Sequence, residues 1–188
     1  PGNGYTNGER SIDNVTFYTR LAQRMIHIFE TRMSLGQLYE IDMRLRPSGA
    51  SGMLVSSFTG FEQYQRSDAW TWEHQALVRV RAIAGDEQLA GRLESLRRDI
   101  LCSERDAREL AQAVVDMREK MRRHHGVSAE DDELDLKQGF GGSVDIEFMV
   151  QYAVLAWAAR DRSLAEWSDN VRILDTLGTL DILATLNT

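Results

Sequence analysis

The sequence predicts a mainly α-helical chain in which the last strand or strands of an α+β region precede a helical bundle. Only two of the 188 residues are proline, Pro1 and Pro47, so nearly all of the backbone is free to form helices. Apolar residues recur at a spacing of three and four over most of the length, which is typical of amphipathic helices. Residues 37–46 alternate instead with the period of a strand.

The first helix is expected over residues 14–34. Asp13 can cap it, because an aspartate side chain accepts hydrogen bonds from the free N–H groups of the first turn. Its apolar residues would form one buried stripe: Val15, Tyr18, Leu21, Met25 and Ile28. Gly36 is expected to end this helix.

Residues 37–46 are expected to form a half-buried strand that ends in the turn "RPSGASG". One face would be apolar and the other would carry Glu40, Asp42, Arg44 and Arg46. A carboxylate beside two arginines suits metal-bound phosphates, with the carboxylate as a metal ligand and the guanidiniums as phosphate clamps. On the pattern alone, an exposed strand face with cross-strand ion pairs is the favoured interpretation. Residues 53–57 are a candidate for a short second strand.

After these strands the sequence predicts helices only. They are expected over residues 58–66, from Ser67 or Asp68 to Gly85, 87–101, 103–125, 144–160 and from Ser168 to Gly178, with a helical pattern continuing beyond. Ser103, Ser143 and Ser168 are the expected caps. The helix over 144–160 is so apolar that we expect it to be deeply buried. An acidic and then glycine-rich loop would occupy residues 127–142.

The stretch "DLKQGFGGSVDIEF", residues 135–148, joins a glycine-rich turn to the start of a helix. Such a turn can offer backbone N–H groups to an anion, here with Lys137 nearby and with Gly141 and Gly142 in the turn. Asp145 and Glu147 fall in the first helical turn, where the helix dipole favours acids, so a structural role explains them equally well. The spacing matches neither a Walker A loop nor a dinucleotide fingerprint.

Composition narrows the possible functions. The net charge of −7 argues against a nucleic-acid surface and against an anionic membrane surface. The single cysteine, Cys102, excludes an internal disulfide framework and fits a reducing compartment. No apolar run approaches 18 residues and the first residues have no signal-peptide pattern, so we expect a cytoplasmic chain. The polar start "PGNGYTNGERSIDN" reads as a loop inside a longer fold, which suggests a fragment.

Several longer blocks carry a resemblance to a known family. They are "FYTRLAQRMI", "LYEIDMRLRPSGASGMLVSSFTGFEQYQ", "AWTWEHQALVRVRAIAGD", "MREKMRRHHG", "DLKQGFGGSVDIEFMVQY" and "WSDNVRILDTLG". In this order, from about residue 17 to 178, they resemble glutamine synthetase adenylyltransferase (glutamate–ammonia ligase adenylyltransferase). That family adenylylates and deadenylylates a tyrosine of glutamine synthetase. The wording "RLRPSGASG" and "AWTWEHQAL" resembles its C-terminal, adenylyl-transferring half.

The resemblance implies a domain plan and a site. Residues 1–57 would be the C-terminal part of a nucleotidyltransferase palm, and residues 58–188 a helical domain that is cut short. Asp42 matches the third metal-binding carboxylate, for Mg²⁺ or Mn²⁺, and Arg44 and Arg46 would meet the phosphates of the substrate ATP. A second group of residues matches the family's glycine-rich block and would bind phosphate or close the site: Lys137, Gly141, Gly142, Asp145 and Glu147. The implied partners are glutamine synthetase, the PII signal protein and glutamine as an effector.

The chain also departs from the family pattern. It has no "GG…SDxDL" segment, which carries two of the three metal-binding carboxylates in this superfamily. We therefore expect the chain alone to be inactive, and the edge of strand 37–46 to be unpaired. Two alternatives stay open: the deadenylylating, phosphorolytic half of the same enzyme, and a helical module that docks another protein.

Overall fold

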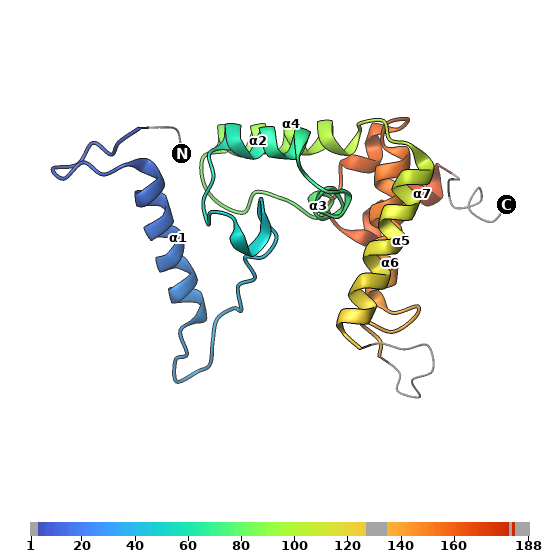
Figure 1. Cartoon of the computed structure of the whole chain (residues 1–188), viewed down its shortest axis with the longest axis horizontal. Helices are drawn as coiled ribbons and strands as arrows, with labels where there is room; N and C mark the ends of the chain where they lie inside the picture. Colours follow the sequence, from blue (N-terminus) through green and yellow to red (C-terminus); the bar gives the residue numbers. More distant parts are fainter. Residues whose placement is uncertain (1–3, 127–134, 181, 183–188) are drawn as a thin grey trace. The chain divides into compact units, whose positions relative to one another are not determined.

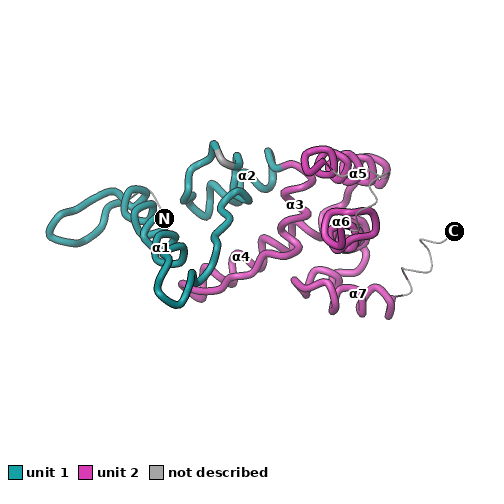
Figure 2. The backbone as a smooth tube through the Cα atoms, turned by 90° about the horizontal axis from the view of Figure 1, so that it is seen from below, with its two compact units in different colours: residues 1–69 teal, residues 70–188 magenta. Residues whose placement is uncertain are grey.

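The computed structural model describes residues 4–126, 135–180 and 182. Within these residues the chain contains seven α-helices, two short 3₁₀ helices and only isolated β-bridges, so the predicted mainly α-helical class is confirmed (Figure 1). The chain divides into two compact units, one ending at Ala69 and the other beginning at Trp70 (Figure 2). None of the described helices is both long and apolar enough to cross a lipid bilayer.

The first unit contains α1 (Asn14–Glu30), η1 (Gly49–Ser51) and α2 (Phe58–Ser67). Asp13 caps α1 as expected, because its Oδ1 accepts the Thr16 N–H at 2.8 Å. The helix ends four residues before the expected end at Ser34. There Thr31 turns to an extended conformation while its N–H still donates to the His27 carbonyl.

The apolar stripe of α1 is exposed, although the sequence predicts a buried one. No residue of α1 is buried; Val15 is partly buried, and the exposed fraction of the large exposed apolar side chains runs from 41% at Phe17 to 59% at Ile28. Periodicity correctly identifies the apolar face, but it does not say whether anything packs on it. In the described part of the first unit, no other element buries this face.

The predicted strand over residues 37–46 is wrong for this structure. The segment is irregular, and the isolated bridges of the described chain lie elsewhere, at Tyr5–Asp13 and Met33–Gly36. A strand needs a neighbour that accepts and donates its backbone hydrogen bonds, and no described segment forms such a ladder with residues 37–46. Residues 53–57 likewise form no strand. The expected turn is present, with Ser48 and η1 after Pro47.

The second unit is a helical bundle. Its elements are α3 (Thr71–Leu77), α4 (Glu87–Leu101), α5 (Ala107–His124), α6 (Ser143–Trp157), η2 (Arg162–Ala165) and α7 (Asn170–Thr179). α5 and α6 pack side by side, α3 contacts both of them, and α7 packs on α6 (Figure 1). The bounds of α4 match the expected 87–101, whereas the single helix expected from Ser67 or Asp68 to Gly85 is only the short α3.

Three predicted helix caps are wrong, each by one or a few residues. Asp106 caps α5, where its Oδ1 accepts two backbone N–H groups at 2.9 Å. Asp169 caps α7 in the same way, and Gly142 precedes α6 without a side-chain cap. The free N–H groups of α5 and α7 bond to an aspartate that follows the expected serine, three residues after Ser103 and one residue after Ser168. The acidic part of the expected loop, residues 127–134, lies outside the described residues.

Arg97 is the largest fully buried side chain of the described residues, and it joins three segments of the second unit. Its guanidinium donates to the carbonyls of Leu77 and Val78 at 2.9 and 2.8 Å. It also donates to the carbonyls of Ala165 and Trp167, at 2.6 and 2.8 Å. Burial lowers its pKa, and the charge of Glu94 opposes that effect. One side chain of α4 therefore donates hydrogen bonds to the backbone carbonyls at the C-terminal ends of α3 and η2 and just beyond them.

Candidate functional site

In the first unit the structure brings Asp42 and Arg44 together. The Arg44 Nε lies 3.0 Å from both carboxylate oxygens, and its Nη2 lies 2.6 Å from Oδ2. The Arg44 backbone N–H adds a bond of 2.8 Å to Oδ1. The hydrogen bonds from Arg44 lower the pKa of Asp42 to about 2, so this carboxylate is ionised at neutral pH. Both side chains are exposed, Arg44 by 83% and Asp42 by 51%.

Arg46 points to the turn and not to Asp42. Its Nη1 donates to the Met43 carbonyl and its Nε donates to the Gly52 carbonyl at 3.3 Å. The alternation of residues 40–46 predicts one shared polar face, but that prediction requires a regular strand. Because the segment is irregular, Arg46 instead closes the turn that follows.

Asp42 does not form a metal site by itself with the neighbours described here. Both of its oxygens accept hydrogen bonds from Arg44, and no group of three or more His, Cys, Asp or Glu that could hold a metal occurs among the described residues. Mg²⁺ and Mn²⁺ prefer six oxygen ligands, of which this carboxylate offers at most two. The residues present therefore do not fit a bound metal ion on their own.

In the second unit, the glycine-rich turn uses its own N–H groups internally. Asp135 Oδ1 accepts the N–H groups of Lys137 and Gln138 at 2.8 and 2.9 Å. The Gly142 N–H donates to the Gly139 carbonyl at 3.0 Å. Gly141, whose φ of 75° is left-handed, donates its N–H to Asp145 Oδ2 at 2.8 Å. The N–H groups of this turn thus bind carboxylates of the same chain, those of Asp135 and Asp145.

Gly142 is required by close backbone packing. A Cβ at this position would lie 2.9–3.0 Å from the carbonyl oxygens of Leu136, Lys137 and Gly139. These are backbone atoms and cannot move aside cheaply. The glycine therefore lets the turn fold against the start of α6, a role that differs from the predicted phosphate contact.

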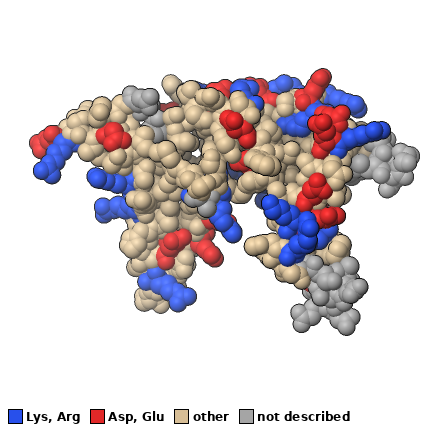
Figure 3. All heavy atoms as spheres, viewed as in Figure 1, with Lys and Arg blue, Asp and Glu red and all other residues tan. Residues whose placement is uncertain are grey.

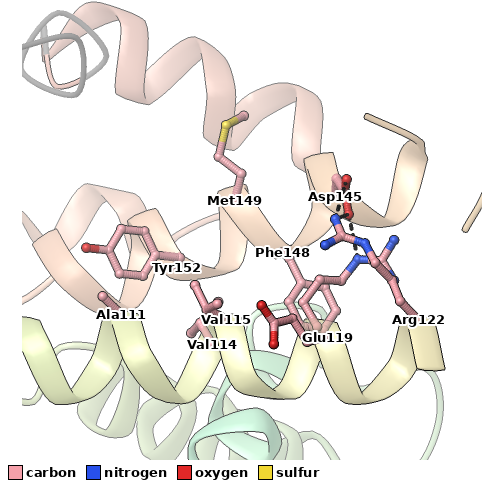
Figure 4. Close-up of a pocket in the computed structure, with 10 residues that line it drawn as sticks. Ala111, Val114, Val115, Glu119, Arg122, Asp145, Phe148, Met149 and Tyr152 are labelled. Atoms are coloured by element: carbon pink, nitrogen blue, oxygen red, sulfur yellow. Dashed lines mark hydrogen bonds and ion pairs between the residues drawn. The ribbon is translucent and has the colours of Figure 1, made fainter. Parts of the chain in front are cut away.

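Asp145 is the centre of a polar cluster in the second unit (Figure 4). Its carboxylate accepts a hydrogen bond from Arg118 Nε at 2.5 Å. It also accepts Arg122 Nη2, which lies 2.8 Å from each carboxylate oxygen. Arg118, which is 6% exposed, also donates to the Gln138 carbonyl at 2.8 Å. The guanidinium of Arg122 lies 4.2 Å from the centroid of the Phe140 ring. The cluster ties α5 to the glycine-rich turn and to the first turn of α6.

Sequence reasoning missed the two arginines of this cluster. Their spacing of four in "MREKMRRHHG" places Arg118 and Arg122 on one face of a helix, and this was the available signal. Glu147 has a different partner from Asp145, because side chains two residues apart on a helix point in different directions. It pairs with Arg79 at 2.9 Å, and the same Arg79 nitrogen lies 3.4 Å from Asn170 Oδ1.

We expect Asp145→Asn to destabilise the protein by about 1–3 kcal/mol at pH 7, because a buried arginine loses its counter-charge. Burial by itself would raise the Asp145 pKa, but hydrogen bonds from Arg118, the Gly141 N–H and Arg122 outweigh it and leave the pKa below its usual value. A depressed folded-state pKa contributes stability above the unfolded pKa of about 3.9, and this stability disappears as the pH falls through the folded pKa. Urea unfolding of both proteins between pH 3 and 7 checks this.

The difference between the two proteins should therefore be largest at neutral pH and shrink in acid. A difference in unfolding free energy that does not vary with pH would contradict an ionised, paired Asp145. Glu62→Gln provides the control, since Glu62 makes an exposed i,i+4 pair with Arg66 that should contribute little.

Comparison with known proteins finds a matching family model and closely similar relatives. The family model for glutamate-ammonia ligase adenylyltransferase matches residues 1–95. The bifunctional glutamine synthetase adenylyltransferase/adenylyl-removing enzyme of Shewanella frigidimarina (strain NCIMB 400) is 56% identical over 182 residues. The protein of the same name from Shewanella loihica (strain ATCC BAA-1088 / PV-4) is 55% identical over 182 residues. Both matches cover 97% of this chain and 19% of the relative, so the chain spans about a fifth of their length.

Proposed function

The chain belongs to the glutamate-ammonia ligase adenylyltransferase family, and we propose that it is part of an enzyme that transfers AMP from ATP to a tyrosine of glutamine synthetase. The observation that carries the proposal is the 56% identity over 97% of the chain to an enzyme whose name states both adenylyl transfer and adenylyl removal. Of the two halves, the transferring one is favoured by "RLRPSGASG" and "AWTWEHQAL" in this sequence. The phosphorolytic half is the alternative.

For the first unit we propose that Asp42, Arg44 and Arg46 contribute to the binding of the reacting phosphates. Asp42 would contribute one carboxylate to a Mg²⁺ or Mn²⁺ site whose remaining ligands lie outside this chain. Arg44 keeps that carboxylate ionised, and its long exposed side chain can exchange the carboxylate for a phosphate. Arg46 is held at the turn, where it would meet a second phosphate oxygen.

For the second unit we propose separate roles for the residues of the glycine-rich turn and of the start of α6. Lys137, whose side chain is exposed on the glycine-rich turn, would contact phosphate. Gly141 and Gly142 would shape the turn that presents it, and Asp145 would hold that turn in place through its hydrogen bond with Gly141. Glu147, paired with Arg79, would help to close the site.

Arg44→Ala in the full-length enzyme is expected to raise the KM for ATP or lower kcat by about ten-fold or more, because a charge-assisted contact to phosphate is lost. The measurement is AMP transfer from labelled ATP to glutamine synthetase, with phosphate-dependent AMP removal assayed in parallel. Loss of transfer with removal retained supports the transferring half. Loss of removal alone supports the alternative.

Arg66→Ala is the matched control, since Arg66 lies in the same unit and makes an exposed pair with Glu62. It should leave both reactions unchanged. If Arg44→Ala also leaves KM and kcat unchanged in both reactions, Arg44 serves only to pair with Asp42.

We also propose that these 188 residues by themselves transfer no AMP, because the sequence lacks the "GG…SDxDL" acid pair of the superfamily. The PII signal protein and glutamine are proposed as regulators of the whole enzyme from the family resemblance, without a site assigned to either. A location in the cytosol fits the single cysteine and the same resemblance.

A further inference from the structure

The most apolar of the described helices, α6, has one face that no described residue covers fully. Between Phe148 and Trp157, α6 has no charged residue, and the sequence predicts that it is deeply buried. That prediction is wrong for one side, because Ile146 and Met149 are 44% and 45% exposed. A helix that is apolar on all sides is normally covered on all sides.

Met149 lies on one wall of a groove of about 460 Å³ between α5 and α6, and Ile146 lies outside this groove. The groove is lined by Ala111, Val114, Val115, Arg118, Glu119 and Arg122 from α5, and by Asp145, Phe148, Met149 and Tyr152 from α6. Val115 is 51% exposed. On both helices the lining residues are three or four apart, so each wall is a single stripe. Two such stripes side by side form the kind of surface into which the side chains of a third helix insert.

Three charged side chains of the lining pair with one another: Arg118, Arg122 and Asp145. Within the described residues, the buried Arg122 Nε has no hydrogen-bond partner. Asp145 and Arg122 close one end by pairing with each other, while Tyr152 lies toward the other end (Figure 4). Arg118 is also taken up by Asp145. Pockets for small polar ligands present polar groups that converge on the ligand. Among the charged residues that line this groove, only Glu119 is exposed. Because few polar groups converge on the space, the groove favours an apolar occupant.

The rim of α5 adds a charge pattern. Arg108, Asp116, Glu119 and Arg123 follow one another along its exposed side, in the order positive, negative, negative, positive. Acidic and basic side chains are interspersed over this face of the second unit (Figure 3). Charged residues that flank an apolar seam select the partner helix and its direction. Two copies of α5 paired antiparallel about the midpoint between Val115 and Asp116 would oppose Arg108 to Arg123, which disfavours a second copy of this chain.

We propose that the α5–α6 groove receives the apolar face of an amphipathic helix from the part of the full-length enzyme that lies outside these 188 residues. That helix would place a basic residue opposite Glu119 and an acidic residue opposite Arg123. The relatives are about five times longer than the matched segment, so most of their chain is available to supply it. This intramolecular docking surface does not depend on which adenylyl reaction the enzyme performs.

The test measures cysteine accessibility in a Cys102→Ala background. Met149→Cys is labelled with a maleimide in the 188-residue chain and in the full-length protein that contains it. We expect labelling to be about ten-fold slower or more in the full-length protein, because the docked helix must detach before the reagent enters. Lys120→Cys, on the opposite side of α5, is the control and should react equally fast in both.

Three outcomes would overturn the proposal. Labelling of the Met149→Cys variant at equal rates in both proteins would mean that no helix covers the groove. Equal slowing at positions 149 and 120 would mean general burial of α5. Slow labelling of the 188-residue chain that accelerates on dilution would identify a second copy as the occupant.

Met149→Asp gives an independent readout. It should lower the Tm of the full-length protein, where the docked helix would have to cover a charge. The Tm of the 188-residue chain should fall less, since the Met149 side chain is already 45% exposed there and the change costs only its partial burial and the repulsion from Asp145 four residues earlier. Equal changes in the two proteins would also overturn the proposal.

Discussion

On the proposal that Asp42 contributes a charged metal ligand to an AMP-transferring enzyme, replacing it with asparagine is expected to lower AMP transfer by the full-length enzyme about a thousand-fold, because the loss of such a ligand removes several kcal/mol of transition-state stabilisation. Asparagine is nearly isosteric with aspartate, and the Asp42 side chain is 51% exposed. Thermal unfolding should therefore be unaffected. Initial rates of AMP transfer to glutamine synthetase, together with Tm values, measure both effects.

The matched control is Glu62→Gln, which removes an exposed carboxylate of the same unit and should leave the rate unchanged. A second variant, Asp42→Glu, keeps the charge but moves it by one methylene, so it should retain more activity than Asp42→Asn. If Asp42→Asn keeps most of the wild-type rate, Asp42 is not part of the reacting site and serves only as the partner of Arg44.

The largest expected loss of stability follows from Arg97→Met. Methionine fills a similar volume but leaves the carbonyls of Val78, Ala165 and Trp167 without this donor, whereas the Leu77 carbonyl still accepts the Val80 N–H. Each buried carbonyl that loses its partner costs about 1–3 kcal/mol, and the cost is partly offset because no charge has to be desolvated. We expect a net loss of about 3–5 kcal/mol, a large share of the stability of an ordinary domain. Urea unfolding measures it.

Arg98→Met is the control for this prediction. Arg98 is next in sequence on the same helix, is 46% exposed and makes only an i,i+4 pair with Glu94, so its loss should cost less than about 0.5 kcal/mol. If Arg97→Met does not fold, Arg97→Lys keeps the charge with fewer donors and should give an intermediate stability. An Arg97→Met protein as stable as Arg98→Met would contradict the role of Arg97.

Features that depend on neighbours in sequence could be predicted. Asp13 as a cap and the bounds of α4 follow from contacts within a few residues, and both are confirmed. The caps of α5 and α7 were missed by one to three residues, because serine and aspartate stood close together and both can cap a helix. The strand over 37–46 was missed for another reason. Its alternation is local, but a strand exists only beside another strand.

Sequence alone thus determined the helical class of this protein, the apolar stripes of its helices and, by resemblance, its family. Only the tertiary structure decided the partners of the charged residues. It turned the N–H of Gly141 toward Asp145 and brought Arg118 from α5 to the same carboxylate. It also buried Arg97 beneath carbonyls that lie 19 to 70 residues away in sequence. The physical reason is that a charged side chain takes the partner that packing brings within about 3 Å, and spacing along the chain does not fix that distance.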